Sequence, residues 1–230
     1  MFIRVAVLID AEFFLKRYRT IFKNFPEHLT PATTAKALVD QALRHIQKPS
    51  EDPFQPPEHL YRIFIYDAPP MQKRIHHPLT QKAIHLAKTP EALFRKEFHA
   101  LLMKKPNISL RFGYLDERNA YWRIKKSSLK EFLKNKRPWE SLNESDLEYY
   151  AKQKGVDMKL GLDIATLTHK KLVEKIVLIS GDSDFVPAAK LARREGIKFV
   201  LDSMGQPIKE DLQEHIDWLK TTVNFPRKTQ

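Results

Sequence analysis

Two carboxylates stand where buried segments of the chain end. Asp10 follows the apolar run Ile3–Ile9, and Asp182 follows the run Ile176–Ile179 after a Ser-Gly turn. Both runs are too short for a helix and rich in β-branched residues, so they predict buried strands of a parallel sheet. If the two strands are neighbours, both carboxylates lie at one edge, the place where such sheets form sites. Their mutual repulsion there favours a bound divalent cation.

Three further acidic residues extend this candidate site. Asp184 follows Asp182 directly, with the alternative role of capping the next helix. Asp157 and Asp163 lie on the helix that precedes the second strand and runs antiparallel to it, so the start of this helix is at the same sheet edge. Asp157 has an alternative role as the N-cap, whereas Asp163 lies about 9 Å further along the axis and has no evident capping role. A cluster of such oxygen ligands predicts Mg²⁺ or Mn²⁺ as the cofactor.

The composition favours a polyanionic partner. The 230 residues include 40 basic and 28 acidic side chains, a net charge of +12 that points to nucleic acid, with an acidic membrane surface as the weaker alternative. Cysteine is absent, which excludes disulfides, thiolate zinc sites and Cys nucleophiles. The first ten residues lack the features of a signal peptide, and no apolar run is long enough to span a membrane. A cytoplasmic location is the default, and the oligomeric state stays open, a homodimer included.

The segment 117–139 is strongly basic and contains aromatic residues. Basic side chains neutralise phosphates and aromatic faces stack on bases, so the segment is the best candidate for a nucleic-acid contact. A solvated helix with a few packing aromatics is an equally good interpretation. The residues assigned to nucleic-acid binding are Arg118, Trp122, Arg123, Lys125, Lys126 and Lys130.

The alternation of apolar runs and amphipathic stretches predicts a parallel sheet with helices on both faces. The strands are expected at 3–9, 60–66, 107–115, 175–180 and 197–201. Helices are expected at 32–47, 79–104, 143–152, 157–172 and 208–220, with two more starting near Phe13 and ending at Arg194. We expect a single domain over 1–222 with a basic helical insertion at 116–153, a proline-rich loop at 48–58, and a flexible tail at 223–230.

Four motifs resemble the NYN domain, a branch of the PIN-like nucleases. They are IDAEFF at 9–14, YDAPP at 66–70, KGVDMKLGLD at 154–163 and LISGDSDF at 178–185. The resemblance covers most of residues 2–203, and LISGDSDF is its most specific part. It implies a three-layer α/β/α sandwich with a five-stranded parallel sheet in the order 3-2-1-4-5. It also implies metal-dependent ribonuclease activity, with RNA as the partner.

The resemblance assigns roles to the acidic residues. Asp10 and Asp182 correspond to the ligands of the first and fourth strands, and Asp184 is the further carboxylate of the last motif. For the remaining acidic position, spacing favours Asp163, whereas Asp157 belongs to the KGVD element typical of NYN domains. The expected metal ligands are Asp10, Asp163 and Asp182, with Asp157 and Asp184 holding a second metal or orienting waters.

One position departs from the family pattern. The first motif of the family usually reads Asp-Gly-x-Asn, and here Phe13 stands in place of the Asn. The leading hypothesis is a metal-dependent ribonuclease, with endonucleolytic cleavage favoured. The alternative is a non-catalytic nucleic-acid-binding or adaptor module on the same fold, which Phe13 supports. A phosphatase or phosphotransferase of another α/β class is a weaker third hypothesis, because the first motif lacks the Asp-x-Asp spacing common in such enzymes.

Overall fold

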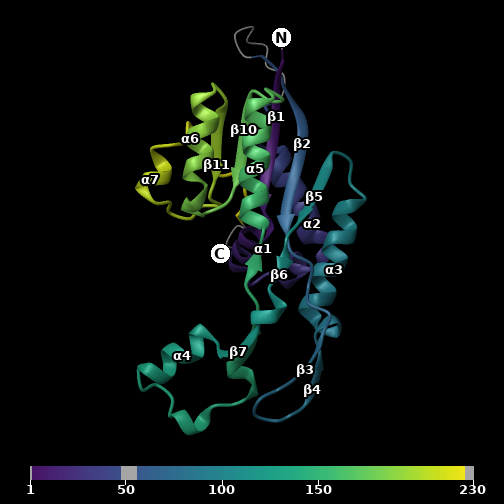
Figure 1. Cartoon of the computed structure of the whole chain (residues 1–230), viewed down its shortest axis with the longest axis vertical. Helices are drawn as coiled ribbons and strands as arrows, with labels where there is room; N and C mark the ends of the chain where they lie inside the picture. The colour runs from purple at the N-terminus through teal and green to yellow at the C-terminus, as the bar shows by residue number, and fades with distance from the viewer. Residues whose placement is uncertain (1, 48–55, 226–230) are drawn as a thin grey trace.

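The computed structural model of the chain describes residues 2–47 and 56–225 (Figure 1). The centre of this part of the chain is a six-stranded parallel sheet with the order β12-β11-β10-β1-β2-β5. Its strands are β1 (Ile3–Asp10), β2 (Glu58–Asp67), β5 (Ile108–Phe112), β10 (Lys175–Ile179), β11 (Lys198–Asp202) and β12 (Trp218–Leu219).

The strand β1 lies at the centre of the sheet. It pairs in parallel with β2 on one side and with β10 on the other, where Val5 lies opposite Lys175 and Ile9 opposite Ile179. The expected adjacency of the first and fourth predicted strands is therefore confirmed. The expected count of five strands is wrong, because β12 adds to the edge strand β11 and changes the full order accordingly.

Helices cover both faces of the sheet, because successive residues of each strand point to opposite faces. Val5, Val7 and Ile9 pack into one buried cluster, and Ala6 and Leu8 into the other. The first cluster is closed by α1 (Ala11–Ile21), α2 (Pro31–Leu43) and α3 (Pro90–Met103). The second is closed by α5 (Val156–His169), α6 (Val186–Arg194) and the short α7 (Glu210–Gln213). The result is a three-layer α/β/α arrangement compatible with a PIN-like sandwich.

The helix expected at 79–104 begins only at Pro90. A residue before proline is disfavoured in the α region, and Thr89 there is extended and caps the helix by accepting the N–H of Ala92. The preceding residues form an antiparallel hairpin of β3 (Arg74–His76) and β4 (Ala83–His85).

The insertion at 116–153 is only partly helical. Its helix is α4 (Lys126–Leu133), and the acidic helix expected at 143–152 is wrong, because β8 (Leu147–Tyr150) pairs with β7 (Tyr121–Ile124). The tandem tyrosines of β8 suit the faces of a hairpin better than a helix. In Figure 1 this insertion and the β3–β4 hairpin project beyond the carboxyl ends of the sheet strands.

Two more predicted elements are shorter than expected. The third strand breaks at Gly113, where a β-carbon would lie 2.4 Å from the carbonyl oxygen of Lys154. The strand then continues as β6 (Tyr114–Leu115), paired with β9 (Gln153–Lys154). The closing helix stops at Gln213, because the carboxylate and the backbone N–H of Asp217 both bond to the backbone of Phe199 in β11.

The remaining turns of helix are of the 3₁₀ type. They are η1 (Pro26–Leu29), η2 (Leu86–Lys88), η3 (Glu117–Asn119), η4 (Trp139–Ser141), η5 (Glu144–Asp146) and η6 (Ser183–Phe185). None of the helices in the described ranges is both long and apolar enough to cross a bilayer. The predicted proline-rich loop falls mainly on residues 48–55 and the end of the predicted tail on 226–230, and both lie outside the described residues.

Candidate active site at the carboxyl edge of the sheet

Asp10 is the last residue of β1 and also the N-cap of α1. Its Oδ1 accepts the backbone N–H of Phe13 at 3.1 Å. The pKa of Asp10 is raised to about 7, chiefly by burial and further by the nearby charges of Glu12 and Asp157, against the lowering effect of the Phe13 hydrogen bond. At neutral pH this carboxylate is therefore poised between its two protonation states unless a cation balances its charge.

Asp182 comes from the neighbouring strand. It follows β10 through Ser180 and Gly181, and its Oδ1 accepts the N–H of Asp184 at 3.0 Å, which caps η6. Since Ile9 lies opposite Ile179 in the sheet, Asp10 and Asp182 both reach the same hollow of about 430 Å³.

Asp157 faces this hollow from the first turn of α5. The helix begins at Val156 with Gly155 as its N-cap, so the alternative role of Asp157 as the cap is wrong. Burial raises the pKa of Asp157, and the charges of Asp182, Asp184 and Glu12 add to this effect. Asp184 is therefore close enough to affect the pKa of Asp157. Its own side chain is exposed and lies at the edge of the acidic group.

We call this cavity the acidic hollow. Its lining residues come from β1, α1, the insertion, α5 and the loops after β10 and β11. They are Asp10, Glu12, Phe13, Lys16, Tyr150, Lys152, Gln153, Asp157, Gly181, Asp182 and Gln206. The sequence reasoning missed the contribution of the insertion, whose one signal was the Tyr149-Tyr150 pair at the end of the expected helix.

Asp163 lies elsewhere on α5. Its Oδ2 accepts hydrogen bonds from the Tyr66 hydroxyl at 2.8 Å and from Arg111 Nε at 3.1 Å, toward β2 and β5. Burial, followed by the charge of Asp163, raises the pKa of Tyr66. Six residues of helix turn a side chain by roughly 240°, so Asp157 and Asp163 point apart. The expected convergence of Asp163 with Asp10 and Asp182 is therefore not what the structure shows.

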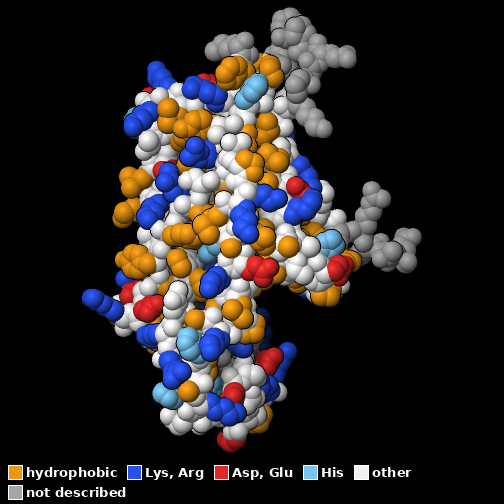
Figure 2. Space-filling view, turned by 90° about the vertical axis from the view of Figure 1, so that its right-hand side faces the viewer, with side chains coloured by type: hydrophobic (Ala, Val, Ile, Leu, Met, Phe, Trp, Pro, Cys, Tyr) orange, Lys and Arg blue, Asp and Glu red, His pale blue; other side chains and the backbone are white. Residues whose placement is uncertain are grey.

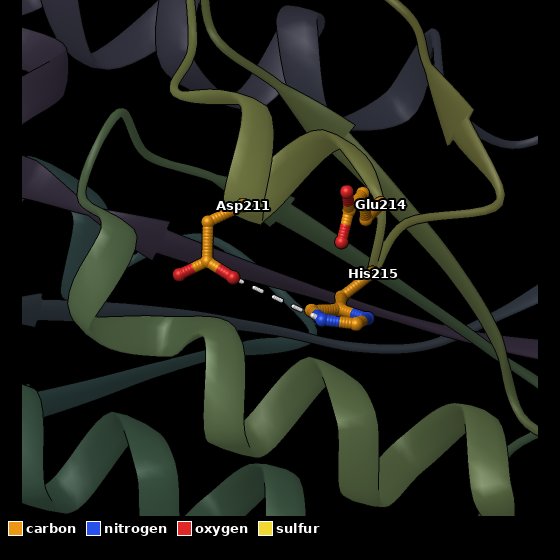
Figure 3. A group of neighbouring side chains, drawn as sticks. All are labelled: Asp211, Glu214 and His215. Carbon is orange, nitrogen blue, oxygen red and sulfur yellow. Dashed lines mark ion pairs between the residues drawn. The ribbon is translucent and has the colours of Figure 1, made fainter.

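The spacing of the carboxylates bears on which cation they fit. Among the described residues, one group of three candidate ligands has its atoms within 4.8 Å of one another. It consists of Asp211, Glu214 and His215, at α7 and not in the acidic hollow (Figure 3). The acidic hollow is thus more open than a fully protein-ligated site. Its all-oxygen donor set fits Mg²⁺ or Mn²⁺ held through one or two carboxylates together with waters.

Comparison with known proteins identifies the family. The sequence model of the NYN domain matches residues 93–218, more than half of the chain. The chain belongs to the NYN domain family. This match includes Asp157, Asp182 and Asp184 and begins after the first motif, whose Asp10 joins the site through the β1–β10 pairing. NYN domains are PIN-like, and members of the family are typically nucleases.

Comparison with solved structures finds similar chains, of which one is described here. A crystal structure of a protein of unknown function from Vibrio parahaemolyticus is 13% identical, with a TM-score of 0.45, over 94% of this chain and 90% of that one. A comparison with curated proteins gives no match.

Phe13, which the resemblance of the first motif places at the family's Asn position, packs against the loop after β10. A β-carbon on Gly181 would lie 2.6 Å from Cε2 of the Phe13 ring. The ring therefore gives the acidic hollow an apolar surface, and a side chain at position 181 would have to displace it.

The basic residues predicted to bind nucleic acid have different surroundings. Arg123 pairs with Glu148, Lys125 donates to the carbonyl oxygen of Ser145, and the Trp122 indole donates to the carbonyl oxygen of His76. Exposed side chains are those of Arg118, Lys126 and Lys130. Figure 2 shows Lys and Arg spread over one face of the molecule with few acidic side chains among them.

Trp122 is less available for stacking than the sequence suggested. Its ring packs edge-on against His77 and Tyr149, with centroid distances of 4.8 and 5.5 Å. Together with its hydrogen bond to His76, these contacts make it a link between the two projecting hairpins.

Proposed function

We propose that this NYN domain is a metal-dependent ribonuclease whose active site is the acidic hollow. The observation that carries the proposal is the meeting of Asp10, Asp157 and Asp182 around one cavity, together with the raised pKa of Asp10. Uncompensated carboxylates in a partly buried cavity destabilise a fold, so their presence here favours a bound cation. The family, which typically contains nucleases, supports the same conclusion.

Asp10 and Asp182 would hold the cation, because each is fixed by a backbone hydrogen bond at the end of its strand. Bound Mg²⁺ or Mn²⁺ supplies the Lewis acidity needed for attack of water on a phosphodiester. Asp157 faces these two carboxylates and would orient water in the hollow. Lys16, which lines the same cavity, would bind the negatively charged phosphate of the substrate.

Cleavage of labelled single-stranded RNA and DNA, measured with Mg²⁺, Mn²⁺ or EDTA, tests this proposal. Asp182→Asn keeps the oxygen that accepts the Asp184 N–H and removes the charge, so we expect a folded protein without cleavage. Asp211→Asn makes the same change in the other acidic group, at α7, and should cut at the wild-type rate. Metal-dependent cleavage that survives Asp182→Asn would contradict the assignment.

A nucleic-acid-binding module without turnover is the second candidate, and the position of Phe13 favours it. Its ring supplies no ligand or hydrogen bond to the acidic hollow. If the apolar ring suppresses catalysis, Phe13→Asn should create or increase metal-dependent cleavage. If the wild type already cleaves and Phe13→Asn has no effect, the ring is only a packing group beside Gly181.

A further inference from the structure

A second cavity continues the acidic hollow toward the insertion. The two cavities share Glu12, Lys16, Tyr150 and Gln153 in their walls, so they form one trough. We call the second part the tyrosine hollow. It measures about 460 Å³ and lies between α1, the start of α3 and the β7–β8 hairpin.

One wall of the tyrosine hollow places an arginine against an aromatic ring. The guanidinium carbon of Arg123 lies 3.6 Å from the centroid of the Tyr150 ring, and Glu148 holds the Arg123 Nε at 2.8 Å. Tyr149 lines the same cavity. Aromatic rings and arginine planes are the surfaces on which proteins stack unpaired bases.

The remaining walls combine apolar surface with fixed cations. Ala68, Pro70 and Met71, in the loop after β2, supply apolar surface. Arg95 also lines the cavity, and its Nη1 is anchored on the buried carboxylate of Asp67. This anchor fixes a positive charge at the wall at little further entropic cost.

The acidic side chains of this cavity are each paired with a basic partner. Glu12 pairs with Lys16, Glu91 with Arg19 and Glu148 with Arg123. These pairs compensate the carboxylates and the lining cations alike, so the walls offer apolar and aromatic surface together with paired charges. That combination matches a base with its sugar and phosphate.

The size of the cavity limits the occupant. A volume of about 460 Å³ lies within the range of pockets for single small ligands, roughly 300–1,000 Å³. One base with its sugar fits such a space, whereas a base that remains paired in a duplex cannot enter it.

We propose that the tyrosine hollow binds one unpaired nucleotide next to the phosphodiester in the acidic hollow, which makes the protein selective for single-stranded RNA. The position of the bond to be cut is then set by the nucleotide held against Tyr150. This inference rests on the proposed function for the identity of the substrate, but its test uses binding alone.

The test measures fluorescence anisotropy of a short labelled RNA, with EDTA present so that no cleavage occurs. Three ligands are compared: the single strand, the same strand carrying one abasic position moved along its length, and the blunt duplex. We expect the single strand to bind at least tenfold more tightly than the duplex. We also expect one abasic position to weaken binding clearly more than the others. Equal binding of all three ligands overturns the proposal without any mutation.

Variants locate the binding site. Tyr150→Ala should weaken single-strand binding by about 5- to 150-fold, the range for loss of one base stack, and Tyr150→Phe should restore it. Tyr114→Ala removes an exposed aromatic ring on β6, outside the hollow, and should bind as the wild type does. Arg123→Ala provides a second test if Tyr150→Ala does not fold. Wild-type binding by both alanine variants overturns the proposal.

The outcomes separate this proposal from the nuclease proposal. Binding that depends on Tyr150, without cleavage under any metal condition, supports the nucleotide pocket and contradicts the nuclease. Cleavage that depends on Asp182 but is insensitive to Tyr150 and equal on single strands and duplexes supports the nuclease and contradicts the pocket.

Discussion

The substitution Asp10→Asn should stabilise the metal-free protein, and the gain should grow as the pH rises. The pKa of Asp10 is raised from 3.8 to about 7, chiefly by burial. An unfolded chain therefore loses this proton at lower pH than the folded chain does. Between these two pKa values the folded state binds more protons, so wild-type stability falls as pH increases. Asparagine carries no charge and keeps an oxygen that can accept the Phe13 N–H.

The two pKa values set the size of the effect. One pKa unit corresponds to about 1.4 kcal/mol, so the raised pKa of Asp10 destabilises the metal-free fold by about 4 kcal/mol at pH 8 and by about 2 kcal/mol at pH 5. The free energy of unfolding of Asp10→Asn, relative to the wild type, should thus increase by about 2–3 kcal/mol between these pH values. Urea denaturation in EDTA at both pH values measures this difference.

A matched control and a metal titration complete the experiment. Asp184→Asn removes an exposed charge from the same acidic group, so its effect should stay below about 1 kcal/mol at both pH values. Saturating Mn²⁺ should stabilise the wild type, because the cation binds the folded state, and should have much less effect on Asp10→Asn. If the gain from Asp10→Asn is the same at pH 5 and pH 8, the electrostatic account of the acidic hollow is refuted.

Two further substitutions test how the fold supports the site. Gly113→Ala should destabilise the protein by about 1–3 kcal/mol in urea denaturation, because its methyl group would meet the Lys154 carbonyl. As the control, Gly161→Ala on α5 faces open space and should be neutral or stabilising. Equal effects of the two substitutions would refute the packing argument. Asp67→Ala should lower the free energy of unfolding by about 3–5 kcal/mol and also weaken RNA binding, because it leaves His99 and Arg95 without their shared carboxylate. Retained stability would show that this buried network is dispensable.

The sequence by itself predicted the central strands and that Asp10 and Asp182 meet at one edge of the sheet, where both line the acidic hollow. Asp10 and Asp182 could be paired without a structure, because the carboxyl ends of neighbouring parallel strands lie at one edge however far apart they are in the chain. Their strands are apolar runs whose period and β-branched content are local properties of the sequence. The LISGDSDF motif added the family, which the match over residues 93–218 confirms.

Proline and helix-capping residues also mark a helix boundary that the apolar periodicity alone does not show. Pro90 and the capping Thr89 mark the start of α3, although apolar residues continue the helical pattern before them. The last helix gave no such signal, because its end depends on hydrogen bonds between Asp217 and Phe199, a residue of another element. Edge pairing of this kind is a long-range contact that no short window contains.

Only the tertiary structure decided which carboxylate of α5 belongs to the hollow. The packing of Leu160, Ile164 and Leu167 against the sheet fixes the rotation of the helix about its axis, and this rotation turns Asp157 to the acidic hollow and Asp163 to Arg111. Spacing along the chain gives the angle between the two aspartates and not their absolute direction. The place of Tyr150 in the trough likewise depends on the pairing of β8 with β7, which brings distant segments together.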